Sequence, residues 1–136
     1  MKTPLKGVFN GAFDTVDNIK ISPFSRAYTF SDSVYEVVPF FNSTAIAFDD
    51  HIKRLEFSAS QLAMAVDLKE VIFEINSLIT SSEFSNGYVY YQVTRGVDPL
   101  RSHIHEPNLK IETFGYAKAH LFQWKPLRVS VCDDIR

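Results

Sequence analysis

The apolar residues of this 136-residue chain change their spacing twice, and this restricts the folds that the chain can adopt. Residues 34–48 are rich in β-branched and aromatic side chains. Residues 52–79 then place apolar side chains at steps of three and four. Residues 88–95 are again strongly β-prone, and apolar and polar residues alternate over 109–116 and 127–133. A strand repeats every two residues and an α-helix every 3.6. The sequence therefore predicts strands, then two helices, then strands.

Both helices carry one apolar stripe, the first formed by Ile52, Leu55, Ala59, Leu62 and Val66 and the second by Val71, Ile72, Ile75, Leu78 and Ile79. Asp49 or Asp50 is expected to cap the first helix. The predicted strands span residues 8–13 with a turn at Asn10-Gly11, and residues 18–21, 34–41, 45–48, 88–95, 109–116 and 127–133. Helices with one apolar face need a sheet to cover. We therefore predict an α+β fold, a two-layer sandwich of a mainly antiparallel sheet with two helices on one face.

Composition indicates an ordinary globular chain forming a single domain over residues 1–136, with 46% hydrophobic and 22% charged residues. The net charge of −2 gives no electrostatic reason to expect nucleic acid or an anionic membrane as a partner. No apolar run approaches the roughly 20 residues of a membrane span. Cys132 is a lone cysteine, interpreted as a small buried residue, and it cannot form an internal disulfide. This fits a cytoplasmic location.

Arg54 lies in the first turns of the first predicted helix and admits two interpretations. It can pair on the surface with Asp50, four residues earlier. Alternatively, its guanidinium can bind a phosphate through two parallel hydrogen bonds, close to the partial positive charge of a helix N-terminus. His51 is interpreted as a structural residue that bonds the local backbone.

Other candidates lie on strands and on one long loop. Tyr35 and Val37 share one strand face, and Glu36 between them points to the other face, so Glu36 is interpreted as structural. Tyr90 lies mid-strand and is either a pocket residue or a core aromatic. Arg101 and His103 are two residues apart on the loop of residues 96–107, where they can hold a carboxylate together or simply be exposed.

Three segments, residues 26–36 (RAYTFSDSVYE), 51–55 (HIKRL) and 92–96 (QVTRG), resemble in this order the N-terminal part of the class IV aminotransferases. These are the fold-type IV enzymes that depend on pyridoxal 5'-phosphate (PLP), and the likeness is closest to the D-amino acid transaminases. The resemblance implies a transaminase that moves an amino group between an amino acid, D rather than L, and a 2-keto acid.

The resemblance also implies roles for single residues. Arg54 would bind the PLP phosphate, and Tyr35, Val37 and Tyr90 would line the substrate pocket. Arg101 and His103 would hold the substrate carboxylate in the site of the neighbouring subunit, so the complete enzyme would be a homodimer.

The family's cofactor-binding lysine follows a stretch resembling residues 131–136, so we expect it beyond Arg136 and assign no catalytic residue here. The chain would then correspond to the N-terminal (small) domain, inactive by itself and without the C-terminal PLP-lysine domain. It departs from the family at Ala27, Ser31 and Ser33, where glycine is common, and its loop is one residue longer between Gly96 and Arg101.

Three alternatives stay open. The first two are fragments of other members of the same family, a branched-chain aminotransferase or an aminodeoxychorismate lyase. The third is a non-catalytic domain that dimerises or binds a partner through its aromatic-rich sheet. His103 and His105 also form a His-x-His pair with Glu106 beside it, but no third ligand stands at a characteristic spacing, so no metal is expected.

Overall fold

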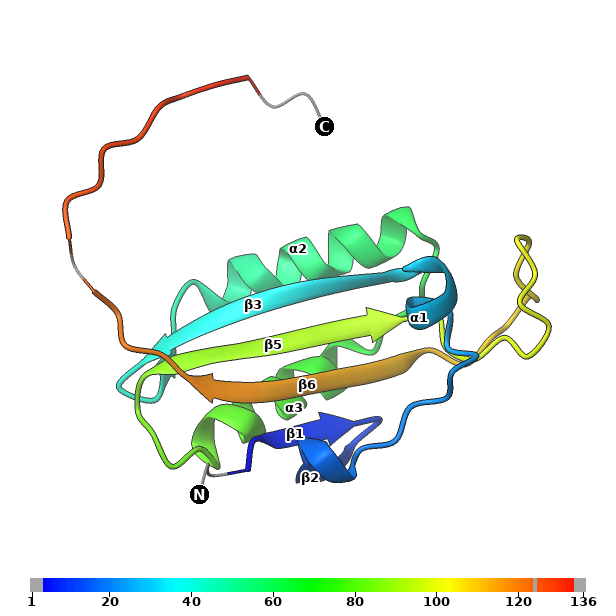
Figure 1. Cartoon of the computed structure of the whole chain (residues 1–136), viewed down its shortest axis with the longest axis horizontal. Helices are drawn as coiled ribbons and strands as arrows, with labels where there is room; N and C mark the ends of the chain where they lie inside the picture. Colours follow the sequence, from blue (N-terminus) through cyan, green and yellow to red (C-terminus); the bar gives the residue numbers. More distant parts are fainter. Residues whose placement is uncertain (1–3, 124, 134–136) are drawn as a thin grey trace.

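The computed structural model describes residues 4–123 and 125–133, which form a six-stranded antiparallel sheet and its helices (Figure 1). The strands are in the spatial order β2-β1-β6-β5-β3-β4. In chain order the elements are β1 (Lys6–Phe9), β2 (Ala12–Thr15), the 3₁₀ helix η1 (Val16–Asn18), α1 (Arg26–Phe30), β3 (Ser33–Phe41), β4 (Thr44–Ala45), α2 (Phe48–Gln61), α3 (Leu68–Thr80), β5 (Gly87–Thr94) and β6 (Glu112–Ala119).

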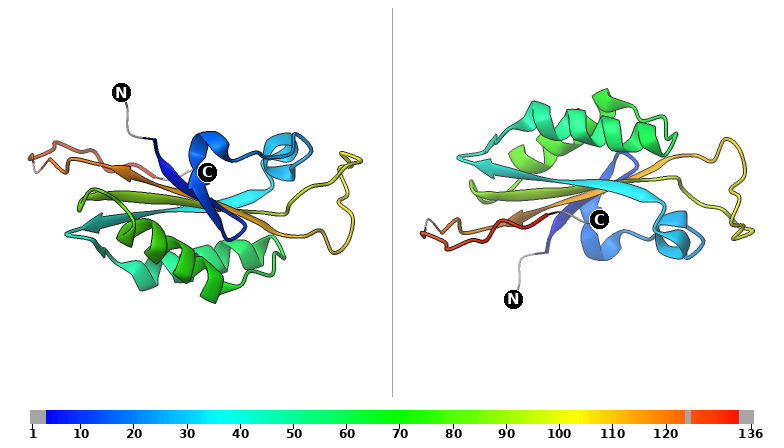
Figure 2. Two further views of the ribbon diagram at one scale, coloured as in Figure 1. Left: turned by 90° about the horizontal axis from the view of Figure 1, so that it is seen from below. Right: turned by 90° about the horizontal axis from the view of Figure 1, so that it is seen from above.

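Helices α2 and α3 both lie on one face of the sheet, and Figure 2 shows this two-layer arrangement edge-on. Helix α2 packs on β3, whereas α3 packs on β1, β5 and β6. The prediction of an α+β fold with an antiparallel sheet and two helices on one face is therefore confirmed.

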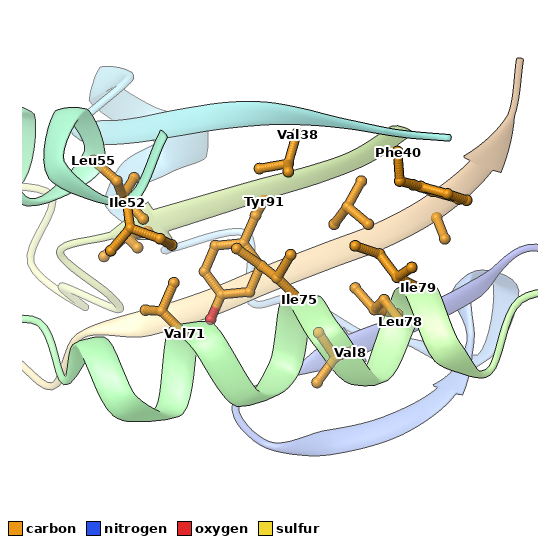
Figure 3. Packing of buried hydrophobic residues seen from close by; sticks show 13 residues of the cluster. Val8, Val38, Phe40, Ile52, Leu55, Val71, Ile75, Leu78, Ile79 and Tyr91 are labelled. Carbon is orange, nitrogen blue, oxygen red and sulfur yellow. The ribbon is translucent and has the colours of Figure 1, made fainter. Parts of the chain in front are cut away.

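The core lies between the helices and the covered face of the sheet (Figure 3). Every second residue of the central strands points into it, as Val38 and Phe40 do in β3 and Tyr91 does in β5. Leu55 of α2 and Ile75 of α3 meet them from the helical layer. Burying a side chain of this size stabilises the folded state by about 1.5–3 kcal/mol relative to leaving it exposed. The helices therefore cover the face of the sheet on which these alternate apolar residues lie.

The alternate residues of the same strands form the opposite, uncovered face. Tyr35 of β3 is 62% exposed there. Its ring stacks on that of Tyr90 of β5 at 5.5 Å between centroids, and Tyr90 stacks in turn on Tyr116 of β6 at 5.4 Å. A row of three tyrosines therefore crosses the middle of the uncovered face.

Several boundaries differ from those predicted. Residues 18–21 form no strand, since the 3₁₀ helix Val16–Asn18 leads into irregular backbone. The return strand predicted over residues 45–48 is only Thr44–Ala45, because α2 already begins at Phe48, before either predicted cap. The last strand of the sheet is shifted from residues 109–116 to Glu112–Ala119.

The predicted strand over residues 127–133 is also wrong. This segment leaves the sheet after β6 and runs away from it, as the orange and red trace of Figure 1 shows. Cys132 is accordingly exposed rather than buried. A strand forms only where a neighbour can satisfy its backbone groups, and no described strand of this chain pairs with the segment.

Candidate functional site

Glu36, His51 and Arg54 form a hydrogen-bonded cluster where α2 crosses β3. Glu36 is the buried member and points from β3 towards the helices. His51 and Arg54 are three residues apart on α2, so they lie on the same side of the helix. His51 Nδ1 lies 2.7 Å from Glu36 Oε2, and Arg54 donates from Nε to Oε1 at 2.5 Å and from Nη2 to Oε2 at 2.6 Å.

The cluster holds Glu36 as a carboxylate. Burial acts to raise the pKa of Glu36, but the hydrogen bonds and charges of Arg54 and His51 outweigh it, so the pKa lies below its ordinary value. The same contacts raise the pKa of Arg54. The Arg54 side chain is nevertheless 65% exposed, and its Nη1 donates to none of the described residues. One nitrogen of a guanidinium fixed by two bonds is therefore left to bind a further anion.

Arg54 meets two residues of the uncovered sheet face around a shallow hollow of about 330 Å³. Its lining consists of Tyr35, Glu36, Val37, Arg54 and Ser58. The hollow lies where no described strand pairs with the outer edge of β3, since β4 pairs with it only at Phe40 and Phe41. The guanidinium from the helical layer can thus reach a phenol and an apolar side chain from the other face.

Tyr90 adjoins this hollow without lining it. Its ring stacks on Tyr35, and its hydroxyl donates to Gln92 Oε1 at 2.9 Å. Burial, followed by the nearby Tyr116 and Tyr35 hydroxyls, raises the pKa of Tyr90. The Tyr90 hydroxyl is therefore a neutral hydrogen-bonding group beside the hollow at neutral pH.

Arg101 and His103 form a second group on the loop that joins β5 to β6. They do not line the hollow of Tyr35 and Arg54. Both contact Phe30 of α1: the Arg101 guanidinium lies 4.8 Å from the ring centroid, and the His103 ring packs edge-on at 5.4 Å. Figure 1 shows this yellow loop projecting beyond the end of the sheet.

The partners of His51 and Arg54 differ from those that the sequence suggested. His51 bonds the Glu36 carboxylate, not the local backbone, and Arg54 pairs with Glu36 rather than with Asp50. Glu36 was interpreted as structural, and in the structure it orients both α2 side chains. A signal was present in the sequence: a carboxylate on the helix-facing side of a strand needs cationic partners, and His51 and Arg54 share one side of the helix that follows.

Within residues 4–123 and 125–133, no three His, Cys, Asp or Glu side chains are placed to hold a metal ion. No helix of the described chain has the length and apolar composition needed to cross a membrane.

The family model for amino-transferase class IV matches residues 33–135, well over half of the sequence. The chain therefore belongs to the class IV aminotransferase family, as the segments 26–36, 51–55 and 92–96 predicted.

Curated relatives include two bacterial D-alanine aminotransferases. That of Staphylococcus haemolyticus is 30% identical over 117 residues, covering 85% of this chain and 42% of the relative. That of Bacillus licheniformis is 29% identical over 138 residues, covering 97% and 48% respectively. The chain thus spans less than half the length of these two relatives.

Solved structures of similar fold include the branched-chain amino acid aminotransferase of Escherichia coli, with a TM-score of 0.78 and 17% identity over 87% of this chain and 42% of that one. The 4-amino-4-deoxychorismate lyase of Pseudomonas aeruginosa aligns with a TM-score of 0.72 and 18% identity, over 83% of this chain and 39% of that one. At these identities the likeness concerns the fold.

Proposed function

We propose that this chain supplies the cofactor-phosphate and substrate-binding groups of a PLP-dependent transaminase that moves an amino group between a D-amino acid and a 2-keto acid. The observation that carries the proposal is the hollow shared by Tyr35, Val37 and Arg54. It brings together the Arg54 guanidinium, which can bind an anion, from the helical layer and the Tyr35 phenol and the apolar Val37 side chain from the sheet. Membership of the class IV aminotransferases supports the cofactor, and the D-alanine aminotransferase relatives support the substrate class.

Arg54 fits the phosphate of PLP because Glu36 holds its Nε and Nη2 while its Nη1 makes no hydrogen bond to any described residue. When bound, PLP supplies the electron-withdrawing ring that makes the substrate α-proton removable. The chain's own part is positional. Arg54 holds the phosphate, the Tyr35 hydroxyl bonds the substrate carboxylate, and Val37 and Tyr90 exclude water from the reacting end of the substrate.

Arg101 and His103 hold the substrate carboxylate of the neighbouring subunit in this proposal. Their absence from the hollow of their own chain supports a role in trans, and the enzyme is then a homodimer. The single cysteine is consistent with placing this activity in the cytoplasm.

The first test concerns the phosphate. In the protein expressed from the reading frame that contains this chain, binding of PLP should be compared with that of pyridoxal, which lacks the phosphate. Arg54→Gln should weaken PLP binding about 10- to 100-fold, as expected for loss of a charged hydrogen bond, and should leave pyridoxal binding unchanged. Lys53→Gln, at the exposed neighbouring position, is the matched control. Equal losses in the two variants, or for the two ligands, would contradict the assignment of Arg54.

The second test concerns substrate and subunit. Turnover of D-alanine should exceed turnover of L-leucine with the same 2-keto acid; the reverse order would favour a branched-chain aminotransferase, and turnover of neither would favour a lyase or a non-catalytic domain. Mixed dimers of Arg101→Gln and Arg54→Gln subunits should regain activity, because one of their two sites contains both arginines. No recovery on mixing would place Arg101 in its own subunit's site.

A further inference from the structure

A network of four charges, of which Arg26, Arg95 and Asp98 are buried, joins α1 to the loop that carries Arg101 and His103. Arg26 is its centre and is 4% exposed. Its Nε donates to Asp32 Oδ2 at 2.8 Å, and its Nη1 donates both to Asp98 Oδ2 at 3.1 Å and to the Ser102 carbonyl at 2.7 Å. Arg95 completes the network by donating to both Asp32 oxygens. The Arg26 side chain therefore ties the loop to α1 at two points, on either side of Arg101, and its backbone N–H bonds the Gly96 carbonyl at 2.8 Å.

Asp98, which Arg26 holds, fixes the conformation of the turn that follows it. Its side chain is fully buried; Oδ1 accepts the Leu100 N–H at 3.2 Å, and its carbonyl accepts the Arg101 N–H at 3.2 Å. Proline at position 99 suits the second position of such a turn. Arg101 itself adopts a φ of +45°, a conformation that a non-glycine residue keeps only when its surroundings impose it.

Phe30 gives the two loop side chains a common surface. The Arg26 guanidinium lies 4.4 Å from its ring centroid and the Arg101 guanidinium 4.8 Å, while the His103 ring meets it edge-on. Cations stack favourably on aromatic faces. The two arginines and two aspartates of the network also balance in charge, and none of the described carboxylates pairs with Arg101. The charge of Arg101 is thus held in place and remains available.

We propose that Arg26 and Phe30 are positioning residues for substrate binding: Arg26 fixes the turn at Asp98, and Phe30 orients the Arg101 and His103 side chains toward an incoming carboxylate. This inference rests on the proposed function only for the identity of that carboxylate. The positioning itself is a property of the described chain and can be measured in it.

Arg95 provides a matched control. It is also buried and also pairs with Asp32, but its remaining side-chain hydrogen bond is to the Leu62 carbonyl, away from the loop. Trypsin cleavage of the Arg101–Ser102 bond, followed by mass spectrometry under native conditions, reports local opening of the loop. Arg26→Gln should accelerate this cleavage about tenfold, as expected from loss of a charged hydrogen bond. The cleavage rate of Arg95→Gln should stay within about twofold of the wild-type rate, once both rates are corrected for global unfolding measured in urea. Equal acceleration in the two variants would overturn the inference.

Phe30→Leu covers the case in which Arg26→Gln does not fold. It keeps an apolar side chain but removes the ring face, so the NMR signals of the Arg101 Nε and the His103 ring should shift while those of the Tyr90 ring do not. Unchanged Arg101 and His103 signals would overturn the role of Phe30. In a transamination assay, Arg26→Gln should raise KM for the amino acid more than it lowers kcat. If trypsin cleaves Arg26→Gln faster but its KM is unchanged, Arg26 does position the loop. The result would then contradict the proposed role of Arg101 and His103 in binding the substrate.

Discussion

The Arg54 guanidinium is joined to the Glu36 carboxylate by two parallel hydrogen bonds, Nε to Oε1 and Nη2 to Oε2. Two bonds fix the plane of a guanidinium, which one bond does not. The pair thus determines the direction in which the remaining nitrogen of Arg54 points, and it does so from a strand residue one position away from Tyr35. Glu36 is in this sense part of the anion site, although it would not contact the anion.

Glu36→Gln should lower stability modestly and loosen Arg54. The amide can accept through its oxygen, but its NH₂ group faces a cation and cannot accept from it. The loss is limited because Arg54 is largely exposed and water can replace the missing partner. Urea unfolding would measure the loss and ¹⁵N relaxation of Arg54 Nε the mobility, with Glu56→Gln on the exposed face of α2 as control. An unchanged Nε relaxation rate would show that Glu36 does not hold Arg54.

Low pH should destabilise the native state because it protonates the carboxylates of Glu36 and Asp32. The folded-state pKa of each is lowered by its arginine partners despite burial, from ordinary values of 4.5 for Glu36 and 3.8 for Asp32. Stability from such a group is present above the unfolded-state pKa and is lost as pH falls through the folded-state pKa. The free energy of unfolding should therefore drop below about pH 4.5, and Glu36→Gln should reduce this drop. An identical acid profile in the variant would remove Glu36 as its cause.

The periodicity of the sequence was sufficient to predict both helices and the covered face of the sheet, because burial of alternate residues such as Val38 and Phe40 follows from local pattern. It could not predict that β6 lies between β1 and β5, since that order depends on contacts far apart in the chain. The Arg26–Asp98 pair, 72 residues apart, is of the same kind. Tyr35 and Arg54 could be singled out one by one, but their meeting around the free edge of β3 required the structure.

Ser31→Gly should stabilise the protein. Ser31 ends α1 with a φ of +54°, and its N–H bonds the Arg26 carbonyl. The left-handed conformation costs a residue with a Cβ about 1–2 kcal/mol, which glycine avoids at an entropic cost of about 0.5–1 kcal/mol. A net gain of up to about 1.5 kcal/mol is expected in thermal or urea unfolding. Ser33→Gly, two residues later in β3, should instead destabilise by about 0.5–1 kcal/mol; the same sign for both changes would contradict the argument.

Gly96→Ala should be far more damaging than Gly11→Ala, although both glycines have positive φ values of +96° and +81°. Apart from its two chain neighbours, a Cβ at Gly11 would come no closer than 3.5 Å to any described residue, whereas at Gly96 it would lie 1.9 Å from the backbone oxygen of Lys110. We expect a loss of about 1–2 kcal/mol at Gly11, and a larger loss at Gly96 because backbone must move. Urea unfolding of the two variants provides the comparison, and equal losses would show that Lys110 yields without cost.

Glu74 is a buried carboxyl group on the far side of the sheet from Tyr35. It belongs to α3 and is fully buried against the sheet, and its Oε2 accepts hydrogen bonds from the Tyr91 hydroxyl and, at 3.2 Å, from Thr113 Oγ1. Its Oε1 has no hydrogen-bond partner among the described residues. Burial raises the pKa of Glu74, because an incompletely bonded carboxylate is poorly solvated there.

The stability of the protein should therefore fall as pH rises from about 4.5, the ordinary value for Glu74, toward its raised folded-state pKa. Over this range the native state binds the proton more tightly than the unfolded state, so deprotonation favours unfolding by at most about 1.4 kcal/mol per pH unit. Glu74→Gln keeps an acceptor for Tyr91 but cannot ionise, and it should remove the slope and leave the protein more stable than wild type at pH 7. Urea unfolding between pH 4.5 and pH 8 measures the slope, with Glu56→Gln expected to retain it. If Glu74→Gln and wild type lost stability in parallel across this range, Glu74 would not be the titrating group.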